Sequence, residues 1–177
     1  MKKTAPIRTL ILALFLAAFA ATASAQLQIP GTSVSYRLNS DDWRYIRTFE
    51  HPGGGDIYLY CYVGHVVVDM EGDTILPFLR IFVVRDFDGD LYELAYNRYE
   101  ELPYQAVNEY SKGPGLPASG GLGYVGAYTN PSDQKGYQFY MTYFRDRRTS
   151  IEFRLETTKD TFGEMDFEFQ DILNSIK

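Results

Sequence analysis

The sequence has few of the residues on which metal and redox chemistry depend. Its 177 residues include one cysteine, Cys61, and two histidines, His51 and His65. A single cysteine excludes an internal disulfide, and these three residues fall short of the four ligands of a structural zinc site. Cys61 lies in a strand-like apolar run, which predicts a small buried hydrophobe rather than a reactive thiol. In a strand, Cys61 and His65 would lie about 13 Å apart, too far for a nucleophile and its base.

Catalytic motifs are also missing. The sequence contains no Gly-x-Ser-x-Gly, His-Glu-x-x-His or Cys-x-x-Cys. The glycine- and proline-rich residues 112–123 lack Gly-Lys-Ser/Thr, so they predict a surface loop rather than a phosphate cradle. Paired acids such as Glu100 and Glu101 are common in acidic proteins, so they are little evidence for acid–base catalysis. We therefore expect no enzyme activity and no cofactor, with a small carboxylate-based hydrolase as the alternative.

An excess of basic charge is absent as well, since 17 Lys and Arg face 23 Asp and Glu, a net charge of −6. Three of the bases, Lys2, Lys3 and Arg8, precede an apolar run at residues 10–20 and a small-x-small motif at residues 23–25. This order is typical of a cleaved signal peptide. The run is shorter than the roughly 20 residues that span a bilayer.

We accordingly expect residues 1–25 to be a signal peptide and residues 26–177 to form one domain, periplasmic or secreted. The cleavage site has no cysteine to carry a lipid, and no second apolar run of membrane length follows. The leader removes three basic residues and no acid, so the mature chain carries −9. That charge argues against nucleic acid and anionic membrane surfaces as partners. An envelope protein or a small ligand is the expected partner.

Alternation of apolar and polar residues predicts most of the strands. Residues 137–144 and 150–156 have period two, typical of a hairpin with one packed face and one face that is wetter or differently covered. The nearly continuous apolar run at residues 78–85 predicts a strand covered on both faces. Further strands are predicted at residues 34–38, 43–49, 57–70 and 122–128.

Helical spacing marks two longer segments. Residues 88–102 predict a helix that Pro103 ends, and residues 104–110 predict a second, short helical piece. Thr161 and Glu164 have the spacing of a capping box that opens the last helix. The apolar stripe of that helix consists of Met165, Phe169, Ile172, Leu173 and Ile176.

The order of these elements predicts an α+β fold, with a single antiparallel sheet of about six to seven strands and helices packed on it. Several positions share a pattern with a known family: Trp43, the strand at residues 79–84, the helix at residues 88–102, Gly123 and Tyr124, the strand at residues 137–143 and the ending at residues 169–177. This pattern resembles the PsbP-type fold, an α/β/α sandwich that the Ran-binding Mog protein and small exported bacterial proteins share. The resemblance implies a binding or assembly module without known catalysis, and it transfers no functional residues.

Tyrosines provide the candidate binding residues. Tyr92, Tyr96 and Tyr99 stand at i, i+4 and i+7 of the predicted helix, and Tyr104 follows closely. Aromatic side chains in such a stripe can line a surface that binds a partner or ligand. The alternative is that they pack the helix onto the sheet. We expect an exported, non-catalytic binding module that uses these four residues.

Three aspartates at the start of that helix are the weak candidates for metal binding. Clustered carboxylates such as Asp86, Asp88 and Asp90 suit calcium. However, Gly89 stands fourth instead of sixth, and Asn97 occupies the twelfth position of an EF-hand loop. We interpret the acids as groups that cap a helix N-terminus, with a calcium-stabilised structural protein as the alternative.

Overall fold

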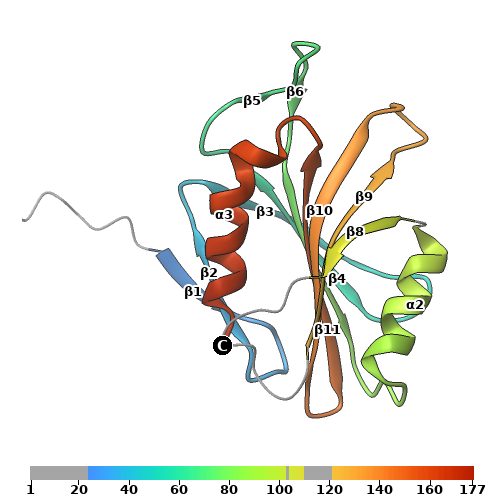
Figure 1. Cartoon of the computed structure of the whole chain (residues 1–177). Coiled ribbons are helices and arrows are strands. Elements are labelled where there is room, and N and C mark those ends of the chain that lie inside the picture. Colours follow the sequence, from blue (N-terminus) through green and yellow to red (C-terminus); the bar gives the residue numbers. More distant parts are fainter. Residues whose placement is uncertain (1–23, 103, 110–120) are drawn as a thin grey trace, which may run out of the picture.

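A seven-stranded antiparallel sheet forms the middle layer of the molecule (Figure 1). The computed structural model describes residues 24–102, 104–109 and 121–177. The strand order is β3-β4-β7-β11-β10-β9-β8, and every pair is antiparallel. The α+β prediction is therefore confirmed. The strands are β3 (Trp43–Glu50), β4 (Asp56–Tyr62), β7 (Phe78–Val84), β8 (Gln105–Glu109), β9 (Leu122–Thr129), β10 (Gly136–Asp146) and β11 (Thr149–Thr158).

One face of the sheet is covered by the C-terminal helix α3 (Phe162–Ser175) and by the hairpin of β1 (Ser24–Gln28) and β2 (Ser35–Asn39) (Figure 1). We call it the α3 face. The helix buries the apolar stripe that the sequence predicts, and β11 contributes three fully buried side chains. Backbone hydrogen bonds between Ser35 and Lys177, at 3.0 and 2.9 Å, fix the chain end to β2. The main contacts come from Ile151, Phe153 and Leu155 of β11 and Met165, Phe169 and Ile172 of α3.

Helix α2 (Leu91–Glu101) lies on the opposite face, which we call the α2 face, so the layers are α/β/α (Figure 1). Leu94 and Ala95 are its buried residues, and they pack against Phe139, Met141 and Tyr143 of β10. Asp90 caps the helix by accepting a 2.8 Å hydrogen bond from the backbone N–H of Glu93, as the sequence indicates. Leu102 follows as the C-cap, in agreement with the predicted end of the helix.

Two local predictions about backbone structure are wrong. Residues 105–109 form the edge strand β8, paired with β9, instead of a helical piece. The open edge of β9 offers backbone hydrogen bonds that outweigh the weak local preference for a helix. The predicted strand at residues 57–70 is also interrupted. It ends at Tyr62, and a separate small hairpin of β5 (Val67–Val68) and β6 (Thr74–Ile75) follows.

The capping box at the start of α3 is not formed. Thr161 has helical dihedral angles, and its hydroxyl bonds the hydroxyls of Thr157 and Thr158 at 2.7 and 2.8 Å. Glu164 binds Nε2 of His65 at 2.6 Å instead of reaching back along the helix. Buried hydroxyls need hydrogen-bond partners, and these three supply them to one another.

Candidate functional site

The three tyrosines of α2 point away from the sheet. Tyr92 is 68% exposed, Tyr96 62% and Tyr99 41%. They therefore do not provide the packing of α2 on the sheet, which Leu94 and Ala95 supply. A row of large exposed aromatic rings on one helix offers apolar area together with hydroxyl groups, a combination typical of protein interfaces.

Tyr104 has a different position from the other three candidates. It is half-buried, and its ring makes edge contacts with Tyr99 at 5.3 Å and with Phe139 at 5.1 Å. Burial is the main cause that raises the pKa of the Tyr104 phenol. Tyr104 thus supports Tyr99 from beneath and links the exposed row to the core.

The aspartates before α2 do not converge on one point. Asp90 caps the helix, and Asp86 and Asp88 form exposed ion pairs with Arg148 at 3.3 and 3.8 Å. Their role in calcium binding stays an untested prediction.

Cys61 is buried, as expected. His65 binds the hydroxyl of Tyr62 at 2.9 Å.

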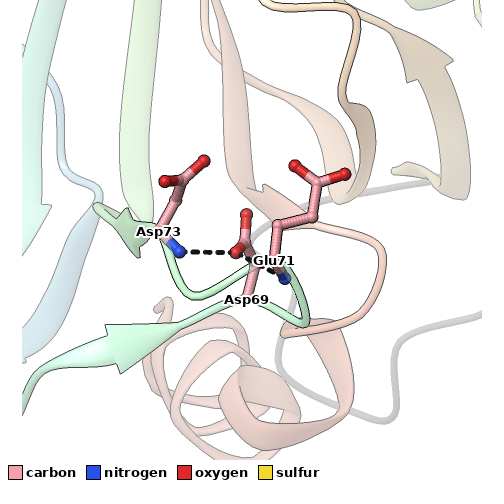
Figure 2. A group of neighbouring side chains, drawn as sticks. All are labelled: Asp69, Glu71 and Asp73. Atoms are coloured by element: carbon pink, nitrogen blue, oxygen red, sulfur yellow. Dashed lines mark hydrogen bonds between the residues drawn. The ribbon is translucent and has the colours of Figure 1, made fainter.

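A cluster of acids that the sequence analysis did not single out lies in the turn between β5 and β6 (Figure 2). Asp69 accepts hydrogen bonds from the backbone N–H groups of Glu71 and Asp73, at 3.1 and 2.8 Å. The ammonium group of Lys135 binds all three carboxylates, at 2.6 Å from Asp73 and 3.4 Å from Glu71. The hydrogen bond from Lys135 is the main cause that lowers the pKa of Asp69. A lysine therefore supplies the positive charge that this turn needs.

The most unusual cluster lies on the α2 face, in a cavity of about 380 Å³ that we call the charged pocket. Its walls are partly apolar and its floor carries charged side chains from β7, β11 and α2. Its volume falls in the range of small-ligand sites, about 300–1,000 Å³. The pocket is lined by Phe49, His51, Ile57, Arg80, Phe82, Arg98, Glu101, Leu102, Tyr128, Asn130, Pro131, Glu152 and Arg154.

Arg98 connects α2 to the floor of the charged pocket. Its Nε donates to Glu152 at 3.0 Å, its Nη1 donates to Glu101, and its guanidinium lies 4.5 Å from the ring centre of Phe82. The Glu152 side chain is only 1% exposed. Burial lowers the pKa of Arg98, but the attraction of Glu152 and Glu101 outweighs it, so the net shift is upward. The Arg98 guanidinium therefore stays charged beside Glu152.

His51 lies at the rim of the charged pocket. Its Nδ1 accepts the backbone N–H of Gly53 at 3.1 Å. Its Nε2 lies 3.0 Å from Glu101 and 3.2 Å from Nη1 of Arg98. His51, Glu101 and Arg98 thus form one polar cluster that lines the cavity.

Two arginines form the second half of the floor, and a glutamate lies beside it. Arg80 and Arg154 are directly opposite on β7 and β11, an arrangement of like charges that destabilises a sheet by itself. Glu156 compensates for it through ion pairs with Arg80 at 2.8 Å and with Arg154 at 2.5 Å. Tyr128 adds a third bond to Glu156 at 3.2 Å. Burial, followed by the charge of Glu156, raises the pKa of Tyr128 to about 12, so the phenol remains a donor.

Arg154 retains one unused donor. Its side chain is only 4% exposed, and its Nε is buried without a hydrogen-bond partner among the described residues. Buried polar groups almost always have a partner, and each exception calls for an explanation such as a ligand or a bound water. Among the described residues that line the pocket there is no serine, threonine or cysteine.

Sequence reasoning missed this pocket because alternation does not show that the polar side chains of β11 are buried. Glu152, Arg154 and Glu156 are 1–3% exposed. Of the two environments expected for this polar face, wetter or differently covered, the structure shows the second. The available signal was Arg80, a charge in the middle of a run that was predicted to be covered on both faces. A charge in such a strand requires a buried partner.

Comparisons with known proteins add little to this geometry. No family model matches the sequence, and no curated protein matches it. Among solved structures the chain is similar to LpqN, described as involved in cell envelope biogenesis of Mycobacterium tuberculosis. The two are 14% identical over 86% of each chain, with a TM-score of 0.42. In the described part of the chain, no helix has the length and hydrophobicity needed to cross a bilayer.

Proposed function

We propose that the chain is an exported, non-catalytic binding module of the bacterial cell envelope, and that a protein partner docks on the tyrosine face of α2. The observation that carries the proposal is the exposure of Tyr92, Tyr96 and Tyr99, because a helix that used them only for packing would bury them. Tyrosine is enriched at protein interfaces, where it supplies a large contact area at a low cost in conformational entropy.

The charge of this face indicates the chemistry of the partner. Glu93, Glu100 and Glu101 are exposed on the same helix, and a hydrogen bond from Tyr96 to Glu100 is the main cause that raises the pKa of Tyr96. Tyrosine rings and carboxylates together favour lysine and arginine side chains. We therefore propose a partner with a basic contact surface, in keeping with the excess of acids in this chain.

Export is part of the same proposal. It is supported by the basic residues, apolar run and small-x-small motif of residues 1–25. Cleavage after Ala25 keeps the pairing of Gln26, Leu27 and Gln28 with β2. The α/β/α layering supports the resemblance to the PsbP-type fold, and membership of that family stays a proposal.

The test compares binding of the mature wild-type chain and of a variant with Tyr92, Tyr96 and Tyr99 replaced by serine. A partner captured from envelope extract is purified, and its affinity for both chains is measured by calorimetry at two salt concentrations. Each interface tyrosine contributes more than about 1 kcal/mol, so the triple variant should bind at least about 100-fold more weakly. Phe167→Ser is the control, because Phe167 is 79% exposed on α3. Unchanged affinity in the triple variant contradicts the proposal.

A carboxylate-based hydrolase is the second candidate. It is favoured by one observation, the pairing of His51 with Glu101 at 3.0 Å beside the buried Glu152 and Tyr128. Such a pair can move a proton at the pocket rim. A hydrolase screen with wild type and the Glu101→Gln variant tests it. Turnover that the variant loses supports this candidate, and a silent screen counts against it.

A further inference from the structure

The charged pocket contains an unsatisfied donor that defines what a ligand must offer. Nε of Arg154 is buried and unpaired among the described residues, and the side chain lines the cavity. The carboxylates nearby already have partners, since Glu152 binds Arg98 and Glu156 binds Arg80. The missing group is thus an acceptor, and a ligand that supplies only donors would leave Arg154 unsatisfied.

Arg80 offers a second, accessible donor group in the same cavity. Its side chain is 38% exposed, and it lies opposite Arg154 in the β7–β11 pair. A guanidinium has five N–H donors, and the ion pair with Glu156 joins one nitrogen of Arg80 at 2.8 Å. Two acceptor oxygens on one group could bond the accessible Arg80 guanidinium and, after a small shift of the Arg154 side chain, its buried Nε. A carboxylate has this form.

The charge balance limits the ligand to a single negative charge. Three arginines, Arg80, Arg98 and Arg154, face three carboxylates in and beside the pocket. A dianion would place two further negative charges beside Glu152 and Glu156, both of which are buried. A monocarboxylate adds one charge next to the unused donors.

The walls define the remainder of the ligand. The rings of Phe49, Phe82 and Tyr128 line the cavity together with Ile57. Aromatic walls favour a flat, apolar body. We infer that the charged pocket binds a small monocarboxylate with a flat apolar body, held by Arg80 and Arg154. This site shares Glu101 with the acids of the tyrosine face, but its ligand is held by Arg80 and Arg154 and not by the tyrosines, so each of the two proposals can fail without the other.

Calorimetric titration of the mature chain with benzoate tests the inference. Benzoate should bind one-to-one with a dissociation constant below about 1 mM. Benzamide has the same shape without the charge, and inorganic phosphate has more charge without the apolar ring, so both should bind at least about tenfold more weakly.

Matched variants locate the site. Arg80→Gln should weaken benzoate binding about tenfold or more, because a hydrogen bond to a charged group is lost. Arg148→Gln is the control, since Arg148 is 75% exposed and pairs with Asp86 and Asp88. Arg154→Lys retains the positive charge beside Glu156 but lacks the Nε–H. It should fold, as shown by thermal unfolding, and bind benzoate more weakly than wild type.

Several results would overturn the inference. Absence of saturable benzoate binding up to about 10 mM would mean that the unused donor serves water alone. Equal affinity for benzoate and benzamide would remove the requirement for a charge. Tighter binding of phosphate would exclude a monoanion site, and equal effects of Arg80→Gln and Arg148→Gln would place the ligand elsewhere.

Discussion

The two faces of strand β11 are equally buried but chemically opposite. On the α3 face, Ile151, Phe153 and Leu155 are fully buried in an apolar core. On the α2 face, Glu152, Arg154 and Glu156 are buried to nearly the same degree. Apolar side chains of similar volume often give equal or greater stability than buried ion pairs. This difference is what the proposals above require, in which the α3 face stabilises the fold and the charges of the α2 face serve binding.

The largest effect is expected on the α3 face. Phe169 is fully buried between the sheet and α3, with its ring 6.3 Å from Trp43 and 5.9 Å from Phe162. Phe169→Ala removes apolar contacts and leaves a cavity, so the free energy of unfolding should fall by about 4 kcal/mol. Chemical denaturation measures it. Phe167→Ala, an exposed site on the same helix, should cost less than about 0.5 kcal/mol. Similar losses of unfolding free energy in both variants would contradict the view that burial against the α3 face of the sheet stabilises the fold.

A pair of substitutions on the α2 face separates stability from binding. Arg98→Leu leaves the buried Glu152 without its partner and should lower the free energy of unfolding by about 3 kcal/mol. The double variant Arg98→Leu with Glu152→Leu removes both charges and should recover most of that loss. Chemical denaturation of wild type, Arg98→Leu and the double variant measures the three free energies of unfolding.

Benzoate titration of the double variant completes that test. With Arg98 and Glu152 replaced, the polar floor of the charged pocket is altered, and benzoate binding should weaken despite the recovered stability. A double variant that remains as unstable as Arg98→Leu would show that this ion pair supports the fold.

The tyrosine face of α2 should matter little for stability. Tyr92, Tyr96 and Tyr99 are exposed, and tyrosine and serine have similar helix propensities. Replacement of all three by serine should change the free energy of unfolding by less than about 0.5 kcal/mol per site. Thermal unfolding checks it. A cooperative loss of several kcal/mol would place these side chains in the core, contrary to their exposure.

The smallest effect is expected in the acidic turn, which belongs to neither face. Lys135 holds the pKa of Asp69 below its ordinary value. When the pH is above the ordinary pKa of an aspartate, the ionised form of Asp69 therefore stabilises the fold. This contribution is lost as the pH falls through the lowered pKa. The difference in melting temperature between wild type and Asp69→Asn should shrink as the pH decreases from about 6 to about 3. A difference that is constant with pH would contradict this assignment.

The sequence predicts the framework of the fold well. Period-two alternation locates β10 and β11, and the apolar stripe ending at Ile176 locates the face of α3 that covers the sheet. These signals are strong because burial repeats along each element. The edge strand β8 was missed because a five-residue segment has weak local preferences and its pairing with β9 decides its structure.

The candidate functional residues were likewise predicted only in part. The exposure of Tyr92, Tyr96 and Tyr99 agrees with their interpretation as surface residues, whereas the charged pocket was not predicted. Its residues come from segments as far apart as His51 and Arg154, and they meet only through sheet pairing and the docking of α2. Alternation leaves open whether such a polar face is wetter or differently covered, so it does not locate a buried charged site.

The most direct test of the difference between the two faces is a benzoate titration followed by NMR of labelled isoleucine methyl groups. Ile57 lines the charged pocket, whereas Ile81 and Ile151 lie in the core of the α3 face of the same sheet. The aromatic ring of bound benzoate should shift the Ile57 methyl signal in a saturable way and leave those of Ile81 and Ile151 in place. Equal shifts of all three signals, or shifts of Ile81 and Ile151 without Ile57, would contradict the assignment of binding to the α2 face.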